Sequence, residues 1–368
     1  MLRELYIETG IALRMLQRGI DRELLVRRDI RRQLREMEGG VPVALRAHHH
    51  VTPWLGGAIA LVVLYRPDGG VPADLVALCA ALTGRGVRVC LIANHPLSEV
   101  QRGAFVDHAG EIVERDNQGG DFGAWREMSL ELATREVAPQ RVLYLNDSVF
   151  YGSRGRDAFL DRLIGGGAAT YAFENWAEGY HLQSFAFALS GDVFAHEAVQ
   201  GFWRDYRPIN NRIHAIEAGE KRLSAAIHAA TDEIEVIFSV ERLARAMEAD
   251  GVESADIITI PKTWRRRADY TLGRAEVTPF GRARTITKVV AATSPIHAGA
   301  YFFPRHLVCP LFKKDLVMRE RFDFWEIEHW TRGLLPEDER AAYLAELRRR
   351  GDPSMLPPMQ RRRIAVGL

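Results

Sequence analysis

The sequence lacks a long apolar segment. Its longest apolar run, residues 58–65, is too short to span a bilayer. The N-terminus carries charges at Arg3, Glu4 and Glu8 and has no uninterrupted apolar core of the kind that a signal peptide needs. We therefore predict a cytoplasmic protein and leave open a peripheral contact with the inner membrane.

Cysteine is scarce as well. Cys79, Cys90 and Cys309 are an odd number of residues and show no CxxC spacing. This pattern argues against a disulfide framework, and a structural zinc site would need a fourth ligand that the sequence does not offer. We expect three reduced thiols, mostly buried, in a reducing compartment.

No charge of one sign dominates. The 368 residues include 49 Lys and Arg against 48 Asp and Glu, so no overall field attracts nucleic acid, and we predict no nucleic-acid partner. Hydrophobic residues make up 47% and charged residues 26%, as in ordinary globular proteins. The absence of GxxxxGK[ST] and of GxSxG argues against a P-loop kinase and an α/β-hydrolase.

Residues 1–40 have leucines and isoleucines at helical spacing among many arginines, and Gly39-Gly40 ends the segment. This predicts a basic amphipathic helix. Two interpretations stay open: the helix packs on the main domain or a partner chain, or it lies on an anionic membrane surface. We expect His48, His49 and His50 in a solvated loop, since adjacent side chains point in different directions.

From residue 57 to residue 174, apolar runs alternate with helical patterns. The runs that predict strands are 58–65, 87–93, 111–114, 141–145 and 169–173. The segments that predict helices between them are 72–82, 98–108, 122–134 and 157–164. Such alternation indicates an α/β fold with a mostly parallel central sheet, whose ligands bind beyond the carboxyl ends of the strands.

The second half of the chain is patterned less clearly. We predict a strand at 181–189 and irregular structure over 251–300. The helices expected there are 192–206, 221–230, 240–250, 325–332 and 337–350. The tail ends in three consecutive arginines, 361–363.

The first candidate segment runs from Arg115 to Trp125, between a strand and a helix. Gly119 and Gly120 permit positive φ and a close approach of backbone to ligand. Asp121 could cap the helix, whose free N–H groups suit a diphosphate. The alternative is a plain left-handed turn with a capping aspartate.

The second candidate is Asn146-Asp147-Ser148, directly after an apolar strand. A carboxylate at this position can bind a divalent cation that neutralises a nucleotide diphosphate. The neighbours of Asp147 are not carboxylates, so the pattern is not a full DxD. A turn started by Asn and Asp is the competing interpretation.

Two further segments carry polar groups suited to a site. His181 and Gln183 would share one face of a strand, as a site wall or as satisfied core residues. Glu217 and Glu220 precede a helix, and either could take a proton from an acceptor hydroxyl or be a solvated charge of the first turn.

Taken in series, these segments resemble the rhamnan synthesis protein F family of bacterial polysaccharide glycosyltransferases. The matching positions are Arg115, Asn117, Gly119–Gly123, Asn146–Ser148, His181–Phe185, Phe202-Trp203, Glu220, Leu223-Ser224, Pro295, His297 and Pro310–Leu316. The resemblance covers roughly residues 57–320. Two departures bear on the donor sugar: Ser294-Pro295-Ile296-His297 replaces an Asn-Pro-Thr-His type of sequence, and Tyr65-Arg66 stands where many relatives place a histidine.

The resemblance implies a GT-A-like fold and a nucleotide-sugar donor. It places a divalent cation, Mg²⁺ or Mn²⁺, at Asp147 and makes Glu220 the catalytic base for the acceptor. The donor site would include Arg115, Asn117, Gly119, Gly120, Asp121, Asn146 and Ser148, and the remaining substrate contacts would come from His181, Gln183 and Ser184.

We therefore predict an inverting glycosyltransferase that moves a sugar, with rhamnose as one candidate, onto a bacterial surface polysaccharide of the O-antigen, capsule or rhamnan type. The acceptor would be a glycan or a lipid-linked glycan. The predicted division is a basic helical extension (1–50), a GT-A-like domain (51–320) and a helical basic tail (321–368). The alternative is a catalytically inactive scaffold of a polysaccharide-synthesis complex.

Overall fold

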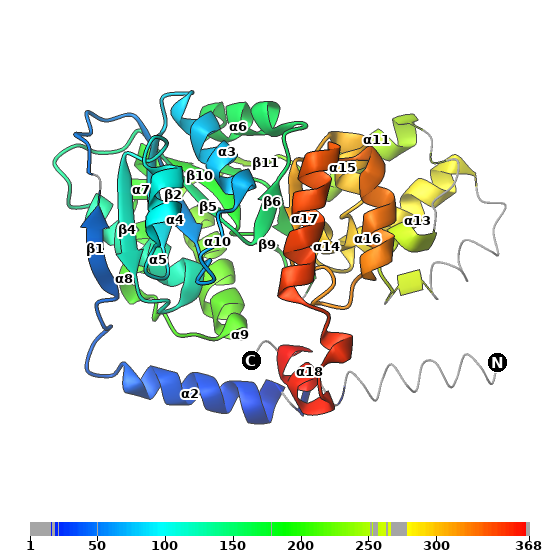
Figure 1. Ribbon diagram of the computed structural model, residues 1–368, viewed down its shortest axis with the longest axis horizontal. Helices are drawn as coiled ribbons and strands as arrows, with labels where there is room; N and C mark the ends of the chain where they lie inside the picture. Colours follow the sequence, from blue (N-terminus) through cyan, green and yellow to red (C-terminus); the bar gives the residue numbers. More distant parts are fainter. Residues whose placement is uncertain are drawn as a thin grey trace.

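The computed structural model describes residues 16, 19–20, 22–49, 51–177, 179–250, 252, 257–262, 264–265 and 278–365. Within them, eight strands form one large sheet in the order β1-β4-β3-β2-β5-β10-β7-β11 (Figure 1). Their bounds are β1 Leu45–His49, β2 Ala58–Leu64, β3 Arg88–Ala93, β4 Glu111–Arg115, β5 Arg141–Asn146, β7 Ala169–Tyr171, β10 Ala186–Ser190 and β11 Ile234–Val236. Strands β4, β3, β2 and β5 are mutually parallel, and β10 runs antiparallel to both of its neighbours. The predicted α/β class with a mostly parallel central sheet is confirmed.

Helices cover both faces of the sheet. On one face lie α3 Ala73–Thr83, α4 Glu99–Phe105, α6 Arg156–Gly165 and α11 Val240–Asp250. On the other lie α5 Gly120–Leu132, α7 Gly191–Ala195, α8 Glu197–Asp205 and α10 Lys221–Ala230. None of the described helices is long and apolar enough to cross a membrane.

The central strand β2 shows why the sequence forms this core. Its residues are Ala, Ile, Leu and Val throughout, which suits a strand buried on both faces. Because successive side chains of a strand point to opposite faces, Ile59, Leu61 and Val63 enter one hydrophobic core and Ala60, Val62 and Leu64 the other. The three cysteines are free and buried, as expected.

A C-terminal unit contains α13 Pro279–Ala291, α14 Pro295–Ala298, α15 Phe302–Leu307, α16 Phe324–Trp330 and α17 Glu337–Arg350. The helices α16 and α17 enclose a third apolar core, whereas α13, α14 and α15 pack into the first core of the main sheet. Strand β12, Leu311–Lys313, pairs antiparallel with β6, Val149–Tyr151, and so attaches this unit directly after β5. Tyr343 of α17 packs against Phe150 and Phe312 of this ribbon. In Figure 1 these helices lie beside the sheet, at the side of β6 and β9.

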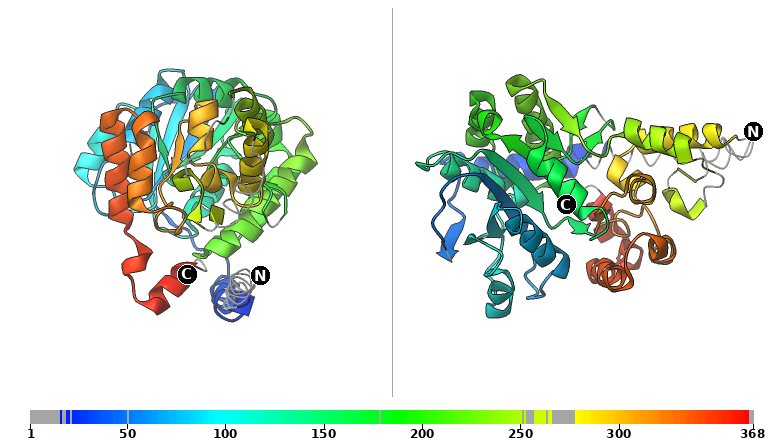
Figure 2. Two further views of the ribbon diagram at one scale, coloured as in Figure 1. Left: turned by 90° about the vertical axis from the view of Figure 1, so that its right-hand side faces the viewer. Right: turned by 90° about the horizontal axis from the view of Figure 1, so that it is seen from above.

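The two terminal helical segments of the described chain lie on one side of the molecule. Helix α2, Arg27–Glu36, follows a π-helical turn, Arg22–Val26, and contacts the main domain through Asp29, which accepts a hydrogen bond from Asn211. The last helix, α18 Pro358–Ala365, follows a 3₁₀ turn at Pro353–Met355. Figures 1 and 2 both show α2 and α18 projecting from the same end of the molecule.

Several local predictions are wrong. His48 and His49 belong to β1, which pairs antiparallel with β4 and so joins the main sheet, whereas His50 lies outside the described residues. The expected strand at 181–189 is two strands, since β9 His181–Leu182 pairs with β8 Glu174–Asn175 and only β10 enters the main sheet.

Two helix predictions also need correction. The expected helix 192–206 is broken at His196, whose extended backbone ends α7 and whose ring accepts the Ala198 N–H that opens α8. The segment expected to be irregular contains helix α13, whose start is capped by the hydroxyl of Thr278.

Candidate active site

The carboxyl ends of β4, β3, β2 and β5 share one edge of the sheet, because these strands are parallel neighbours. The polar or aromatic residues that end or follow them are Arg115 and Asn117, Asn94 and His95, Tyr65 and Arg66, and Asn146–Ser148. Candidate residues from four strands are thus gathered at one edge of the sheet.

Arg115 organises the loop that leaves β4. Its buried guanidinium donates to Glu127 at 2.8 Å, to the side-chain oxygen of Asn94 and to the carbonyl of Gln118 at 2.9 Å. The amide nitrogen of Asn94 and the side-chain oxygen of Asn117 are buried without a hydrogen-bond partner among the described residues. Since buried polar groups are normally paired, these two atoms are candidates for ligand contacts.

The glycines of this loop serve close packing as well as backbone freedom. Gly119 has φ +71°, and a Cβ there would lie 2.4 Å from Pro208, whose segment also supplies the Asn210 oxygen that accepts the Gly119 N–H at 2.7 Å. Gly120 has φ +55° and open space around it. Helix α5 has no side-chain cap; Asp121, predicted as the cap, lies in its first turn and serves another contact.

That contact joins Asp121 to the end of β5. The Asn146 amide donates to the Asp121 carboxylate at 2.6 Å, while its oxygen accepts the Ser148 hydroxyl at 2.7 Å. Burial, and then the charge of Asp147, raises the pKa of Asp121 from its ordinary value to about 7. Asp121 and Asn146, both predicted donor-site residues, are therefore in direct contact, and the carboxyl group of Asp121 has a pKa near neutrality.

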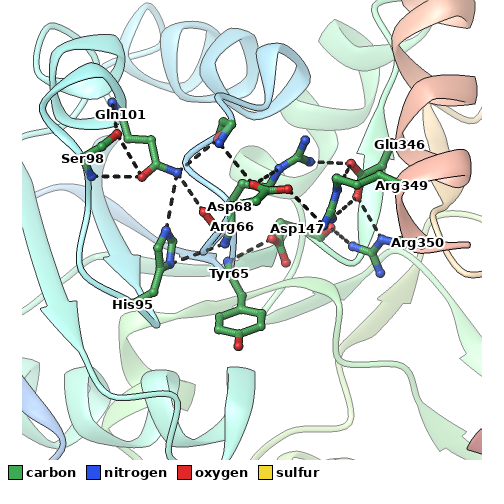
Figure 3. A network of polar contacts seen from close by, with 11 residues as sticks. Tyr65, Arg66, Asp68, His95, Ser98, Gln101, Asp147, Glu346, Arg349 and Arg350 are labelled. Atoms are coloured by element: carbon green, nitrogen blue, oxygen red, sulfur yellow. Dashed lines mark hydrogen bonds and ion pairs between the residues drawn. The ribbon is translucent and has the colours of Figure 1, made fainter.

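Asp147 lies on the other side of Asn146, toward β2. One of its carboxylate oxygens accepts the Tyr65 N–H at 2.9 Å, and its carbonyl accepts a long bond, 3.5 Å, from Arg350 at the end of α17 (Figure 3). Burial raises the pKa of Asp147 as well, although the nearby Lys314 and Arg350 oppose this. Asp121 and Asp147 are thus two electrostatically coupled carboxyl groups at one strand end.

Helix α17 is bound to the same edge by a network of ion pairs (Figure 3). Glu346 is paired with Arg66 after β2 and accepts from Arg349 at 2.7 Å and from Arg350 at 2.9 Å. Burial opposes its ionisation, yet the hydrogen bonds from these arginines hold the pKa of Glu346 at about 2. This network holds α17 firmly against the residues that follow β2.

Asp121 and Asp147 supply as many carboxylates as a divalent cation needs when it also binds the phosphate oxygens of a substrate. Magnesium is commonly held by one or two carboxylates together with such oxygens. Within the described ranges, the one group of three mutually close potential ligands is His48, Glu111 and Glu131, on the far edge of the sheet. Arg135 donates to both of those glutamates at 2.8 Å, so part of their charge is already offset without a metal.

A second cluster joins predicted residues from separate segments. Glu220 ends a π-helical turn, Ala215–Glu220, and its carboxylate accepts the backbone N–H of Ser184 at 2.8 Å. Its other oxygen lies 3.8 Å from the Nε2 atom of His181, a buried nitrogen without a hydrogen-bond partner among the described residues. π-Helical turns inside helices often occur at functional sites.

Gln183 leads away from this cluster into a buried chain. Its amide donates to the Ser294 hydroxyl at 3.2 Å, which lies 2.9 Å from His297 Nδ1, and the Nε2 of that ring lies 2.9 Å from Asp315. Burial lowers the pKa of His297 to about 4 and so favours the neutral ring, although the neighbouring Asp315 opposes this. A neutral ring that donates from Nε2 to Asp315 accepts the Ser294 hydroxyl at Nδ1, and the chain therefore orients Gln183.

Some residues of the site had no assigned role in the sequence. Arg350 and Glu346 lie far along the chain, in a helix whose charges look like an ordinary solvated face. For Lys313 the sequence offered only a weak indication of a role in the site. It ends a short strand that is otherwise apolar and is followed by Lys314, and the alternation of side chains along a strand sends the two lysines to opposite faces.

No protein-family model matches the chain. The uncharacterized protein y4gN of Sinorhizobium fredii is 25% identical over 177 residues, which is 45% of this chain and 44% of that protein. The match therefore covers less than half the length of the curated relative.

Solved structures similar to this chain include a glycosyltransferase and a mannosyltransferase. Glycosyltransferase GlyE of Streptococcus pneumoniae TIGR4 has a TM-score of 0.33 and 11% identity over 60% of this chain and 50% of its own. TarS of S. aureus has a TM-score of 0.32 and 10% identity over 84% and 55%. The mannosyltransferase PcManGT of Pyrobaculum calidifontis, in complex with GDP-Man and Mn²⁺, has a TM-score of 0.27 and 14% identity over 87% and 92%. Scores at this level carry no information on donor, acceptor or mechanism.

Proposed function

We propose that this protein is an inverting glycosyltransferase that moves a sugar from a nucleotide-sugar donor onto a bacterial surface polysaccharide, with rhamnose as one candidate sugar. The observation that carries the proposal is the pair of coupled carboxyls, Asp121 and Asp147, at the strand edge where α/β folds bind their ligands. A divalent cation bound there would neutralise charge on the donor diphosphate. The sequence resemblance supports the same assignment.

In this proposal Glu220 is the base. It takes the proton of the acceptor hydroxyl as that oxygen bonds to the anomeric carbon and the bond from this carbon to the diphosphate breaks. The Ser184 N–H fixes one carboxylate oxygen of Glu220, which leaves the other directed toward His181 and the substrate. Asn94 and Asn117, with their unpaired polar atoms, would contact the donor.

Nucleotide binding tests the proposal. We expect one of UDP, GDP, dTDP and CDP to raise the unfolding temperature in proportion to the logarithm of its concentration, as binding to the native state requires. Mn²⁺ should enlarge the shift, and Asp147→Asn should remove the Mn²⁺-dependent part, because one ligand charge is lost. The measurement is a thermal-shift titration with and without Mn²⁺.

Asp116→Asn is a matched control, because Asp116 lies on the same edge but is exposed and paired with Arg46. An Mn²⁺-dependent shift of equal size in Asp147→Asn and the parent would contradict the role of Asp147. If no nucleotide shifts the parent, the chain is the inactive scaffold that its incomplete DxD pattern also allows.

We further propose that the protein is cytoplasmic and contacts the inner membrane through its two terminal helical segments. Large apolar side chains there are exposed: Leu16, Ile20 and Leu24 near α2, and Met355 and Met359 near α18. Arginines accompany them in both segments, and both segments project from one end of the molecule (Figure 2). Apolar side chains beside basic ones suit an anionic lipid surface.

Co-sedimentation with vesicles tests the contact. We expect binding to phosphatidylglycerol vesicles but not to phosphatidylcholine vesicles, with a loss at high salt. The double variant Ile20→Ser, Leu24→Ser should weaken binding about tenfold or more, since two apolar side chains no longer enter the lipid. Val100→Ser, at a valine of α4 that is more exposed than Ile20 and Leu24, should bind like the parent. Equal binding by the double variant and the parent would contradict the proposal.

A further inference from the structure

Lys313 is a lysine in the site without a carboxylate partner. The register of β12 against β6 sets it opposite Val149, and its ammonium group donates to the Ser148 hydroxyl at 3.0 Å and lies 4.4 Å from the centre of the Phe185 ring. The structure gives it no ion pair within the described residues. The adjacent Lys314, on the opposite face, pairs with Asp74 at 3.1 Å. A buried cation normally has such a partner, so the state of Lys313 calls for an explanation.

None of the described acids around Lys313 is its ion-pair partner. Asp121, Glu220 and Asp315 all act on it electrostatically, yet each is hydrogen-bonded elsewhere. Asp121 is bound to Asn146, Glu220 to the Ser184 N–H, and Asp315 to His297 and Arg319. The ammonium group is therefore attracted to this place by the field of three acids but makes a direct contact with none of them.

Arg212 is a second cation near the same place. It stands at the start of a short helical turn, Arg212–His214, and its guanidinium has no hydrogen bond or ion pair to any residue that the structure describes. Its charge acts on Lys313 and lowers the lysine pKa, while burial has the larger effect in the same direction. Acids nearby act on both cations, but neither cation forms a direct ion pair with a described residue, so their hydrogen-bond donors are available to an anion.

We propose that Lys313 and Arg212 bind the diphosphate of the nucleotide-sugar donor. This inference rests on the proposed function, since it names the residues that would hold the donor's charged group. An ammonium and a guanidinium both donate to phosphate oxygens, and the guanidinium can do so with two parallel bonds. Asp121 on the donor side and Glu220, the proposed base, both lie within electrostatic reach of Lys313.

The two residues would also act during transfer. As the bond between the anomeric carbon and the diphosphate oxygen breaks, its electron pair stays on that oxygen, and the departing diphosphate gains one negative charge. Fixed positive groups at that position stabilise the developing charge. We therefore expect the diphosphate to bind even when no divalent cation is present.

Direct titration tests this inference. UDP, GDP, dTDP and CDP, and the nucleoside of each, are titrated into the parent, Lys313→Met, Arg212→Gln and Lys288→Met, in EDTA and in Mn²⁺. We expect Lys313→Met to weaken nucleoside diphosphate binding in EDTA by about 10- to 100-fold and Arg212→Gln by about tenfold, with nucleoside binding changed less than twofold. Lys288 is exposed on α13, so Lys288→Met should bind like the parent.

Lys313→Arg separates charge from folding. It keeps the positive group and should retain most of the diphosphate affinity, and its unfolding temperature shows whether the site is intact. Diphosphate affinities in Lys313→Met and Arg212→Gln equal to that of the parent would overturn the inference and leave the proposed function standing. Equal losses for diphosphate and nucleoside would also overturn it, since they indicate a structural role. If the parent binds no nucleoside diphosphate, the proposed function fails and the inference fails with it.

Discussion

Glu220→Gln is expected to reduce glycosyl transfer by about 10²- to 10⁴-fold, the usual contribution of a general base. The amide oxygen of glutamine can still accept the Ser184 N–H, which now lies 2.8 Å from Glu220, so the fold of this segment should persist. The proton of the acceptor hydroxyl, however, then has no carboxylate to receive it. Nucleoside diphosphate affinity should change little, because Glu220 acts on the acceptor.

The measurement is the initial rate of nucleoside diphosphate release in the presence of acceptor, together with the dissociation constant of the nucleotide. Glu217→Gln is the matched control, since Glu217 lies on the same π-helical turn but is partly exposed and paired with Lys221 at 3.1 Å. A rate for Glu220→Gln within about threefold of the control would remove Glu220 from the base position.

Asp121→Asn is expected to stabilise the ligand-free protein at pH 8 by about 2–4 kcal/mol. Burial and the neighbouring Asp147 raise the pKa of Asp121 from 3.8 to about 7. A folded-state pKa above the unfolded one means that the folded state holds its proton more tightly. The carboxyl group therefore lowers stability progressively as the pH rises from about 4 to about 7, and the full cost remains above 7.

Asparagine has no such charge, so the gain should be present at pH 8 and vanish near pH 4. Unfolding by urea at pH 4.5, 6 and 8 measures this difference. The exposed Asp116, paired with Arg46, is a control whose change to Asn should alter stability by about 1 kcal/mol or less. A gain of the same size at all three pH values would show that the charge of Asp121 is not its origin.

The same carboxyl group should make cation binding depend on pH. A metal ligand must be deprotonated, so protons compete with the metal as the pH falls below about 7. Mn²⁺-dependent nucleotide binding should accordingly weaken between pH 8 and pH 6, and this fixes the buffers in which the titrations are done.

Much of the fold could be predicted from local pattern. The strands predicted at residues 58–65, 87–93 and 141–145 are confirmed as β2, β3 and β5. They could be predicted because a strand that is buried on both faces requires continuous apolar residues. The roles of the predicted site residues remain predictions. Their positions follow from that pattern, since Asn146–Ser148 stands where a parallel strand ends.

The errors arose where local pattern is ambiguous. The polar run at His48 and His49 gave no sign of a strand, because β1 is an edge strand whose pairing with β4 is decided by contacts far along the chain. The alternation over 181–189 is compatible with one strand or two. The short ribbon of β8 and β9 decides between them by drawing His181 and Leu182 out of the main sheet.

The sequence by itself determined the class of the fold, the apolar strands and the polar residues at their carboxyl ends, because these depend on the order of neighbouring residues. Only the tertiary structure decided which distant groups face them. Lys313 meets Ser148, 165 residues away, through the pairing of β12 with β6, and Arg350 reaches Asp147 across 203 residues through the packing of α17. The raised pKa of Asp121 likewise depends on its burial and on Asp147, and neither is a property of the residues beside it in the chain.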